Sequence, residues 1–239
     1  RLIYKKNVNG QPALVIVNAD GTGARTLPFP VGALTVDDLA EAVSPDGKWL
    51  AFYTGSAEQK EKSDLSLNLM DLSSGQPRLL TRLLSADYPQ NFRQAADLLD
   101  KQGVKLVEGI DQAQILYEAF VYGIDALAWS PDGRYLAFAG QMDGPTSDLY
   151  VYDLRSQATR RLSDGLEQVQ SITWSPDGKW ILHGSANLMG EGMNIHYYAA
   201  AVEGGVIKTL PSSISGIRGW LGPSTCLQTR MSNGPAGTY

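Results

Sequence analysis

Short segments in which apolar and polar residues alternate recur along the chain, and most of them end at turn-forming residues. Alternation with a period of two places every second side chain on one face, so this pattern is typical of half-buried β-strands. Two related segments of this kind are Trp49–Phe52 and Tyr135–Phe138. A second set, each followed by a polar turn, covers Leu65–Leu72, Asp148–Leu154 and Asn194–Ala200. The pattern predicts an all-β fold.

One ten-residue motif occurs three times. It reads VSPDGKWLAF at residues 43–52, WSPDGRYLAF at 129–138 and WSPDGKWILH at 174–183, and a degraded fourth copy, GWLGPSTCLQ, covers 219–228. Proline presets φ for a turn, aspartate bonds its own backbone and glycine tolerates positive φ, so Ser-Pro-Asp-Gly predicts a tight turn between two strands. We assign a structural role in these turns to Ser44, Pro45, Asp46, Gly47, Ser130, Pro131, Asp132, Gly133, Ser175, Pro176, Asp177 and Gly178.

The spacing of the motif predicts the architecture. The second and third copies are 45 residues apart, from Ser130 to Ser175, which is the length of a propeller blade. Each repeat supplies four strands, a to d, and the Ser-Pro-Asp-Gly turn joins a to b. We therefore predict that residues 1–239 form a single β-propeller domain of about four to five four-stranded blades. The ring is either small and closed or a fragment of a larger one.

The two ends of the chain fit this register. Strands b, c and d of a first blade are predicted at Leu2–Tyr4, Ala13–Val17 and Arg25–Leu27. Ile214–Trp220 and Cys226–Met231 are predicted as strands a and b of a last repeat.

Residues 85–123 interrupt the repeat. Apolar residues at helical spacing predict a helical hairpin inserted between two blades, with Gly103 as a C-cap. Its apolar faces either pack on the propeller or dock a partner, and Phe92, Leu99 and Phe120 are the candidate contacts in the second case. A third interpretation is a degenerate blade.

The repeat resembles that of the TolB-like, WD-like β-propeller family: Trp129 and Trp174 precede the turn, and Leu-Tyr-Val-Tyr-Asp-Leu follows at 149–154. Val43 replaces the usual tryptophan in the first copy. The resemblance implies an exported bacterial protein whose propeller binds other proteins at the cell envelope. Similar repeats also form the non-catalytic propeller of prolyl-oligopeptidase-type peptidases, and a propeller scaffold by itself does not define an activity.

Charge and hydropathy exclude several function classes. Twenty Lys and Arg against 25 Asp and Glu give a net charge of −5 with no basic cluster, so we expect no nucleic-acid partner. No apolar run reaches the roughly 18 residues of a membrane span. A membrane anchor or export signal upstream of residue 1 is compatible with this.

The chain offers little catalytic or metal-binding chemistry. It has no Gly-x-Ser-x-Gly motif and no phosphate-binding loop, and its two histidines, His183 and His196, fall on different predicted strands. We therefore predict no enzyme activity, no cofactor and no metal. Asp37 and Asp38 lie either in a solvated loop or at the mouth of the propeller, where they are candidate contacts for a partner.

These observations favour a non-enzymatic interaction or scaffold module that binds a protein or peptide in the periplasm or another extracytoplasmic compartment. The alternatives are the propeller domain of a prolyl-oligopeptidase-type peptidase and a structural subunit of a larger envelope complex.

Overall fold

The computed structural model describes residues 2–29, 43–54, 65–84, 100–101, 103, 126–143, 146–186, 195–211, 214–223 and 225–230. The chain forms two compact units. Unit 1 comprises Arg1–Tyr88 with Gln141–Asp143, and unit 2 comprises Pro89–Gly140 with Gly144–Tyr239. Each unit is built from antiparallel sheets whose strands follow one another in chain order.

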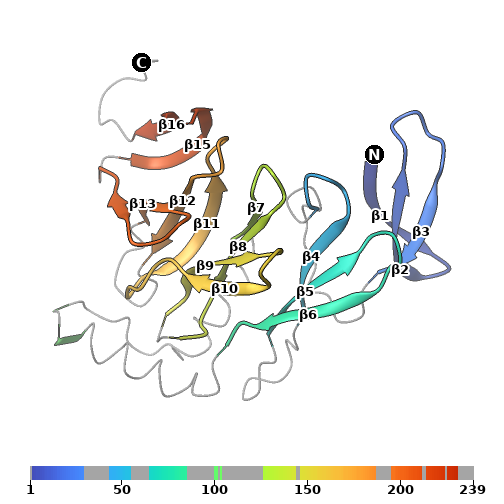
Figure 1. Cartoon of the computed structure of the whole chain (residues 1–239), viewed down its shortest axis with the longest axis horizontal. Coiled ribbons are helices and arrows are strands. Elements are labelled where there is room, and N and C mark those ends of the chain that lie inside the picture. The colour runs from blue at the N-terminus through green and yellow to red at the C-terminus, as the bar shows by residue number, and fades with distance from the viewer. Residues whose placement is uncertain are drawn as a thin grey trace. The chain divides into compact units, whose positions relative to one another are not determined.

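Unit 1 contains two three-stranded sheets, which we call blades A and B (Figure 1). Blade A is formed by β1 (Leu2–Val8), β2 (Gln11–Val17) and β3 (Arg25–Pro28), and blade B by β4 (Trp49–Thr54), β5 (Ser66–Asp71) and β6 (Pro77–Arg82). Val43 adds an isolated antiparallel bridge to Leu50 of β4. The guanidinium of Arg25 in blade A donates to the carbonyl of Ser73 in blade B, at 3.0 Å.

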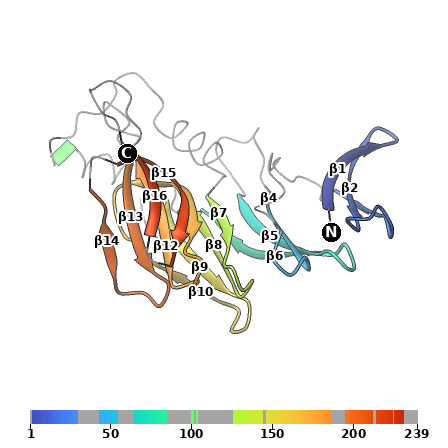
Figure 2. The ribbon, with the colours of Figure 1, turned by 90° about the horizontal axis from the view of Figure 1, so that it is seen from above.

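Unit 2 contains two four-stranded blades, C and D, and a hairpin (Figures 1 and 2). Blade C is formed by β7 (Leu127–Trp129), β8 (Tyr135–Gly140), β9 (Asp148–Asp153) and β10 (Ala158–Arg161), and blade D by β11 (Gln168–Trp174), β12 (Trp180–Ala186), β13 (Ile195–Ala201) and β14 (Ile207–Thr209). The hairpin pairs β15 (Ile214–Gly222) with β16 (Thr225–Arg230).

A continuous apolar core joins blades C and D. Buried side chains from both sheets meet in it, and most are small or β-branched, so that the two sheets approach closely. The indole of Trp174 in β11 donates to the carbonyl of Ala128 in β7, at 2.9 Å, and the Trp174 ring stacks on Tyr135 at 6.1 Å. The core consists of Ala126, Ala137, Ala139, Leu149, Val151, Leu162, Val169, Trp174, Ile181, Ala200 and Val202.

The three Ser-Pro-Asp-Gly segments form the same hydrogen-bonded turn. In the copy at 130–133, the Ser130 hydroxyl donates to Asp132 at 2.6 Å and accepts from the backbone N–H of Tyr135 at 2.8 Å. The glycines have φ of 67–69°, a region that strains other residues. Each serine is buried, so its hydroxyl holds the turn from inside. The third copy shows the electrostatic effect, because the Ser175 hydroxyl and a backbone amide lower the pKa of Asp177.

The all-β propeller prediction is confirmed, and the strands predicted at both ends of the chain are present. The helical hairpin predicted at 85–123 lies outside the described residues, except for Asp100, Lys101 and Gly103. There the N–H of Gly103 donates to the carbonyl of Asp100, and no described element supports a hairpin. Whether residues 1–239 form one domain stays a prediction.

Candidate functional site

The strand order defines two ends in blades C and D. The Ser-Pro-Asp-Gly turns and the turn at 154–157 lie at one end. The other, which we call the connector end, holds residues 162–167 between β10 and β11, together with the beginnings of β9 and β13 and the end of β12. A pocket of about 260 Å³ lies at the connector end between blades C and D. It is lined by Asp148, Ser163, Asp164, Gly165, Leu166, Glu167, His183, Ser185, Tyr198 and Ile207.

The pocket is lined by a ring pair in which histidine stands where the neighbouring blade has phenylalanine. In blade C, Phe138 of β8 pairs with Tyr150 of β9, and their rings stack at 5.8 Å. The equivalent strands of blade D pair His183 with Tyr198, and these rings stack at 5.2 Å. Side chains alternate between the two faces of a strand, so Ser185 lies on the same face of β12 as His183. Ser185 is also polar. The wall of blade D is therefore polar towards its connector end.

Glu167 is held on blade D by two hydrogen bonds. One carboxylate oxygen lies 2.5 Å from Nδ1 of His196, and the other accepts from the Tyr198 hydroxyl at 2.9 Å. Burial, together with the neighbouring Glu167, raises the pKa of Tyr198 to about 12, so its hydroxyl stays protonated at neutral pH. These contacts tie the connector between blades C and D to β13.

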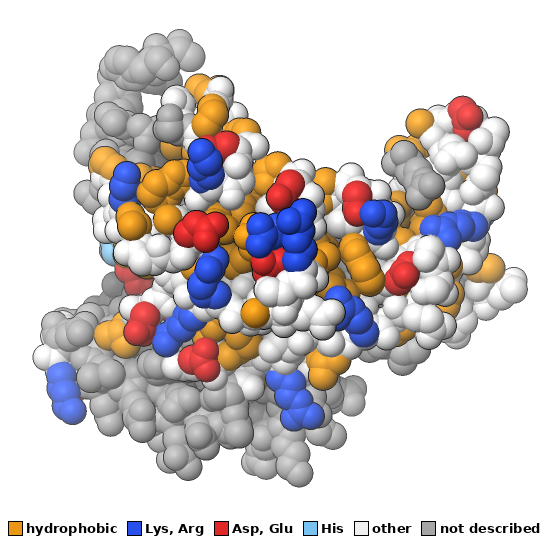
Figure 3. Space-filling model, viewed as in Figure 1, with side chains coloured by type: hydrophobic (Ala, Val, Ile, Leu, Met, Phe, Trp, Pro, Cys, Tyr) orange, Lys and Arg blue, Asp and Glu red, His pale blue; other side chains and the backbone are white. Residues whose placement is uncertain are grey.

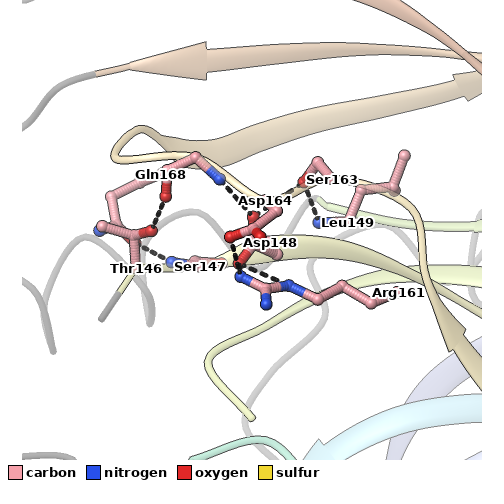
Figure 4. Close-up of polar contacts among 9 residues, drawn as sticks. Thr146, Ser147, Asp148, Leu149, Arg161, Ser163, Asp164 and Gln168 are labelled. Atoms are coloured by element: carbon pink, nitrogen blue, oxygen red, sulfur yellow. Dashed lines mark hydrogen bonds and ion pairs between the residues drawn. The ribbon is translucent and has the colours of Figure 1, made fainter. Parts of the chain in front are cut away.

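Asp148 is the centre of a second polar cluster, drawn in Figure 4, on the blade C side of the pocket. Its carboxylate contacts the Arg161 guanidinium at 2.5 Å and accepts from the Ser163 hydroxyl at 3.0 Å. The same guanidinium lies 2.8 Å from Asp164. Burial raises the pKa of Asp148 to about 6 even though Arg161 acts against this shift. The cluster therefore gathers the carboxyl groups of Asp148 and Asp164 around one guanidinium.

Three buried polar atoms near the connector end lack a hydrogen-bond partner among the residues that the structure describes. They are Oγ of Ser147, Nε2 of Gln168 and Nε2 of His183. Ser147 and Gln168 contact each other through the Ser147 N–H, which donates to the Gln168 side-chain oxygen at 2.7 Å (Figure 4). Buried polar groups are nearly always satisfied, so unpartnered atoms mark positions where a ligand or water gains most by binding.

His183 and Ser185 are in contact but do not form a nucleophile and base. Nδ1 of His183 lies 3.0 Å from the Ser185 hydroxyl, whereas no carboxylate of a described residue bonds to Nε2 and orients the ring. Burial lowers the pKa of His183 to about 4, which makes it a weak base at neutral pH. Ser185 itself is buried. The pair suits a binding wall better than acyl transfer.

The residues proposed from the sequence as partner contacts, Asp37, Asp38, Phe92, Leu99 and Phe120, lie outside the described residues. The pocket was not predicted. One signal for it was present: His183 occupies the motif position that holds phenylalanine at 52 and 138. Glu167 and Asp148 gave no comparable signal, because only folding brings their connector and strand next to β12 and β13.

Comparison with known proteins agrees with this architecture. The WD domain, G-beta repeat family matches residues 117–144 and 158–188. The structure of a TolB from Agrobacterium tumefaciens superposes with a TM-score of 0.52 at 20% identity, covering 90% of this chain and 60% of that one. The chain has the fold of a TolB-like, WD-repeat β-propeller.

Sequence relatives of this propeller include two peptidases. Dipeptidyl-peptidase 5 of Porphyromonas gingivalis is 30% identical over 157 residues, which is 58% of this chain and 22% of that protein. Dipeptidyl-peptidase 5 of Porphyromonas endodontalis is 27% identical over 200 residues, which is 76% of this chain and 27% of that protein. The propeller thus spans only about a quarter of the length of these relatives.

The described surface of the propeller carries mixed charge. On the face shown in Figure 3, Lys and Arg side chains are scattered among Asp and Glu.

Among the described residues, no group of three or more His, Cys, Asp or Glu side chains is placed to hold a metal ion. Within the same part of the chain, no helix has the length and apolar character needed to cross a membrane.

Proposed function

We propose that this propeller is a non-catalytic module that binds a protein or peptide partner, with the connector-end pocket of unit 2 as its contact site. The observation that carries the proposal is the pocket itself. It lies between two blades that share an apolar core, and its polar groups are held in place by the Glu167 and Asp148 clusters before any partner arrives. The periplasm or another extracytoplasmic compartment is its proposed location, in keeping with the TolB-like fold.

Site-specific crosslinking tests this proposal. Ile207 lines the pocket and is 47% exposed, so a photoreactive phenylalanine analogue at 207 reports a partner seated there. Leu79 of β6, 56% exposed, is the matched control position in unit 1. The native full-length protein is irradiated in its own cells, and the products are identified by mass spectrometry. We expect a defined protein adduct from position 207 and none from 79. Equal adducts from both positions, or none, would contradict the proposal.

The absence of catalysis is tested separately. The purified 239-residue chain and its Ser185→Ala variant are incubated with fluorogenic dipeptide substrates. We expect no turnover above buffer from either protein, because no carboxylate in the described part of the chain orients the His183 ring. Hydrolysis by the chain that disappears in Ser185→Ala would show that the pocket is an active site.

A second candidate function is the propeller domain of a longer peptidase. The partial matches to two dipeptidyl-peptidase 5 proteins favour it, because this chain covers only a part of each. Intact-mass measurement of the native protein distinguishes the two candidates. A polypeptide several times longer than 239 residues that cleaves dipeptides from substrates would support the peptidase. A polypeptide without a hydrolase domain would support the interaction module.

A further inference from the structure

Among the described residues, the charged side chains that line the connector-end pocket are all acidic. Asp148, Asp164 and Glu167 contribute carboxylates, and no Lys or Arg is among the described lining residues. Arg161 reaches Asp148 and Asp164 from beside the pocket and supplies one positive charge for two negative ones. The charge left over favours a cation.

The uncharged polar groups of the pocket favour a hydrogen-bond donor. His183 is 3% exposed, lines the pocket and has an unpartnered Nε2. When Nδ1–H donates to the Ser185 hydroxyl, Nε2 is left as an acceptor. The Ser163 and Ser185 oxygens also accept. A ligand group that only donates hydrogen bonds matches this wall, and the ammonium of lysine and the guanidinium of arginine are such groups.

The size and apolar part of the pocket favour a single side chain. Its volume of about 260 Å³ lies just below the roughly 300–1,000 Å³ typical of sites for whole small molecules. Leu166, Ile207 and the ring of Tyr198 supply apolar lining. Lysine and arginine carry a long aliphatic stem that packs on such surface while the charged head reaches polar groups.

We propose that the connector-end pocket binds the side chain of a lysine or arginine supplied by a protein partner. The inference rests on the proposed function, which it extends by naming the chemistry of the contact. It also accounts for the histidine that blade D carries where blade C has phenylalanine: with Nδ1 protonated, the imidazole adds an acceptor to the wall without adding charge.

Titration with single-residue analogues tests the chemistry without knowledge of the partner. Nα-acetyl-arginine amide and Nα-acetyl-lysine amide are added to the 239-residue chain, and binding is followed by NMR through the amide signals of Leu166 and Glu167. Nα-acetyl-citrulline amide and Nα-acetyl-norleucine amide are the neutral comparators of similar shape. We expect the two cations to bind at least about tenfold more tightly than the neutral analogues, and their advantage to shrink as salt is added. Equal binding of charged and neutral analogues would overturn the inference.

Two further experiments test whether the ligand binds at Glu167 and whether the pocket recognises a charged side chain or an α-ammonium group. Glu167→Gln should weaken arginine binding about tenfold, whereas Glu203→Gln, an exposed carboxylate away from the pocket, should change it less than about twofold.

Glycine amide carries only an α-ammonium and should not compete. If it binds as tightly as the lysine analogue, the pocket recognises a chain terminus and the side-chain assignment is wrong. The salt and neutral-analogue arms use the wild-type chain and hold even if Glu167→Gln does not fold.

The outcomes separate this inference from the proposed function. A crosslink from position 207 without a preference for cations would overturn the inference alone. A preference for cations without any crosslink would overturn the proposed partner.

Discussion

The side chain of the buried serine in the Ser-Pro-Asp-Gly turn makes two hydrogen bonds at once. Its hydroxyl donates to the turn aspartate and accepts from the backbone N–H that opens the next strand. The same pair of bonds occurs at Ser44 and Ser175. The repeat therefore preserves a hydrogen-bond geometry rather than a reactive group.

Ser130→Ala is expected to lower the free energy of unfolding by about 1–3 kcal/mol, because the N–H of Tyr135 loses its acceptor, the buried Ser130 hydroxyl. Ser156→Ala, in an exposed turn, is the matched control and should change it by less than about 0.5 kcal/mol. Urea unfolding of both variants measures this. Equal effects would show that the Ser130 hydroxyl is not a structural element.

His183 makes the stability of the fold depend on pH. Burial lowers its pKa to about 4 from an ordinary value of 6.5, so the unfolded chain binds a proton more readily than the folded one between these values. Stability contributed by neutral His183 is therefore fully present above pH 6.5 and is lost as pH falls towards 4. Asp148 acts in the opposite direction, because its raised pKa lets the folded state take up a proton first, from about pH 6 downwards.

His183→Gln is expected to reduce the loss of stability between pH 7 and pH 4.5 by about 2 kcal/mol relative to the wild type. Asp148 is present in both proteins, so the difference between them isolates His183. Urea unfolding at several pH values measures it. Parallel pH profiles for the two proteins would mean that His183 is already protonated or solvated in the folded state.

At the scale of elements, Trp174 links two blades directly. Its indole in β11 donates to a carbonyl of β7, and its ring stacks on Tyr135 at the start of β8. Because apolar side chains of blades C and D are buried against each other, the stability of each blade depends on the presence of its neighbour. The tryptophan before the turn is thus a contact between repeats.

Trp174→Phe keeps most of the packing but removes the donor to Ala128, so we expect a loss of about 1–2 kcal/mol in unfolding free energy. Trp180→Phe, on the partly exposed ring that faces Lys208 at 4.8 Å, should cost under about 1 kcal/mol. Thermal and urea unfolding compare the two. A larger cost at Trp180 would argue against the link between blades.

At the scale of the molecule, the described strands differ widely in burial. All but the last residue of β9 are buried, whereas β1 is exposed along nearly its whole length and is the outer strand of its described sheet. Local opening is cheapest where few apolar contacts must be broken. We therefore expect β1 of unit 1 to open locally more readily than β9 of unit 2.

Amide hydrogen exchange should show protection factors in β9 that exceed those in β1 by about two orders of magnitude or more. Mass spectrometry of peptic fragments, or NMR, measures both strands in one experiment. Similar protection in β1 and β9 would show that β1 is covered by another part of the protein.

Local rules were enough to predict most of the fold. Alternation located the strands at 148–153 and 195–201, and the turn chemistry of Ser-Pro-Asp-Gly located the hairpins, because both depend on residues adjacent in sequence. The 45-residue period then identified the blade. None of this required knowledge of which side chains meet.

The amino-acid sequence by itself determined the repeat, the turn geometry and the propeller fold, since these follow from backbone preferences and a period-two pattern. Only the tertiary structure decided the pocket. Glu167 meets Tyr198 across 31 residues of chain, and Asp148 meets Arg161 across 13. Such contacts depend on which strands lie side by side in the folded blades. The histidine at 183 gains a possible role only when the fold places it in the lining of the same pocket as three carboxylates.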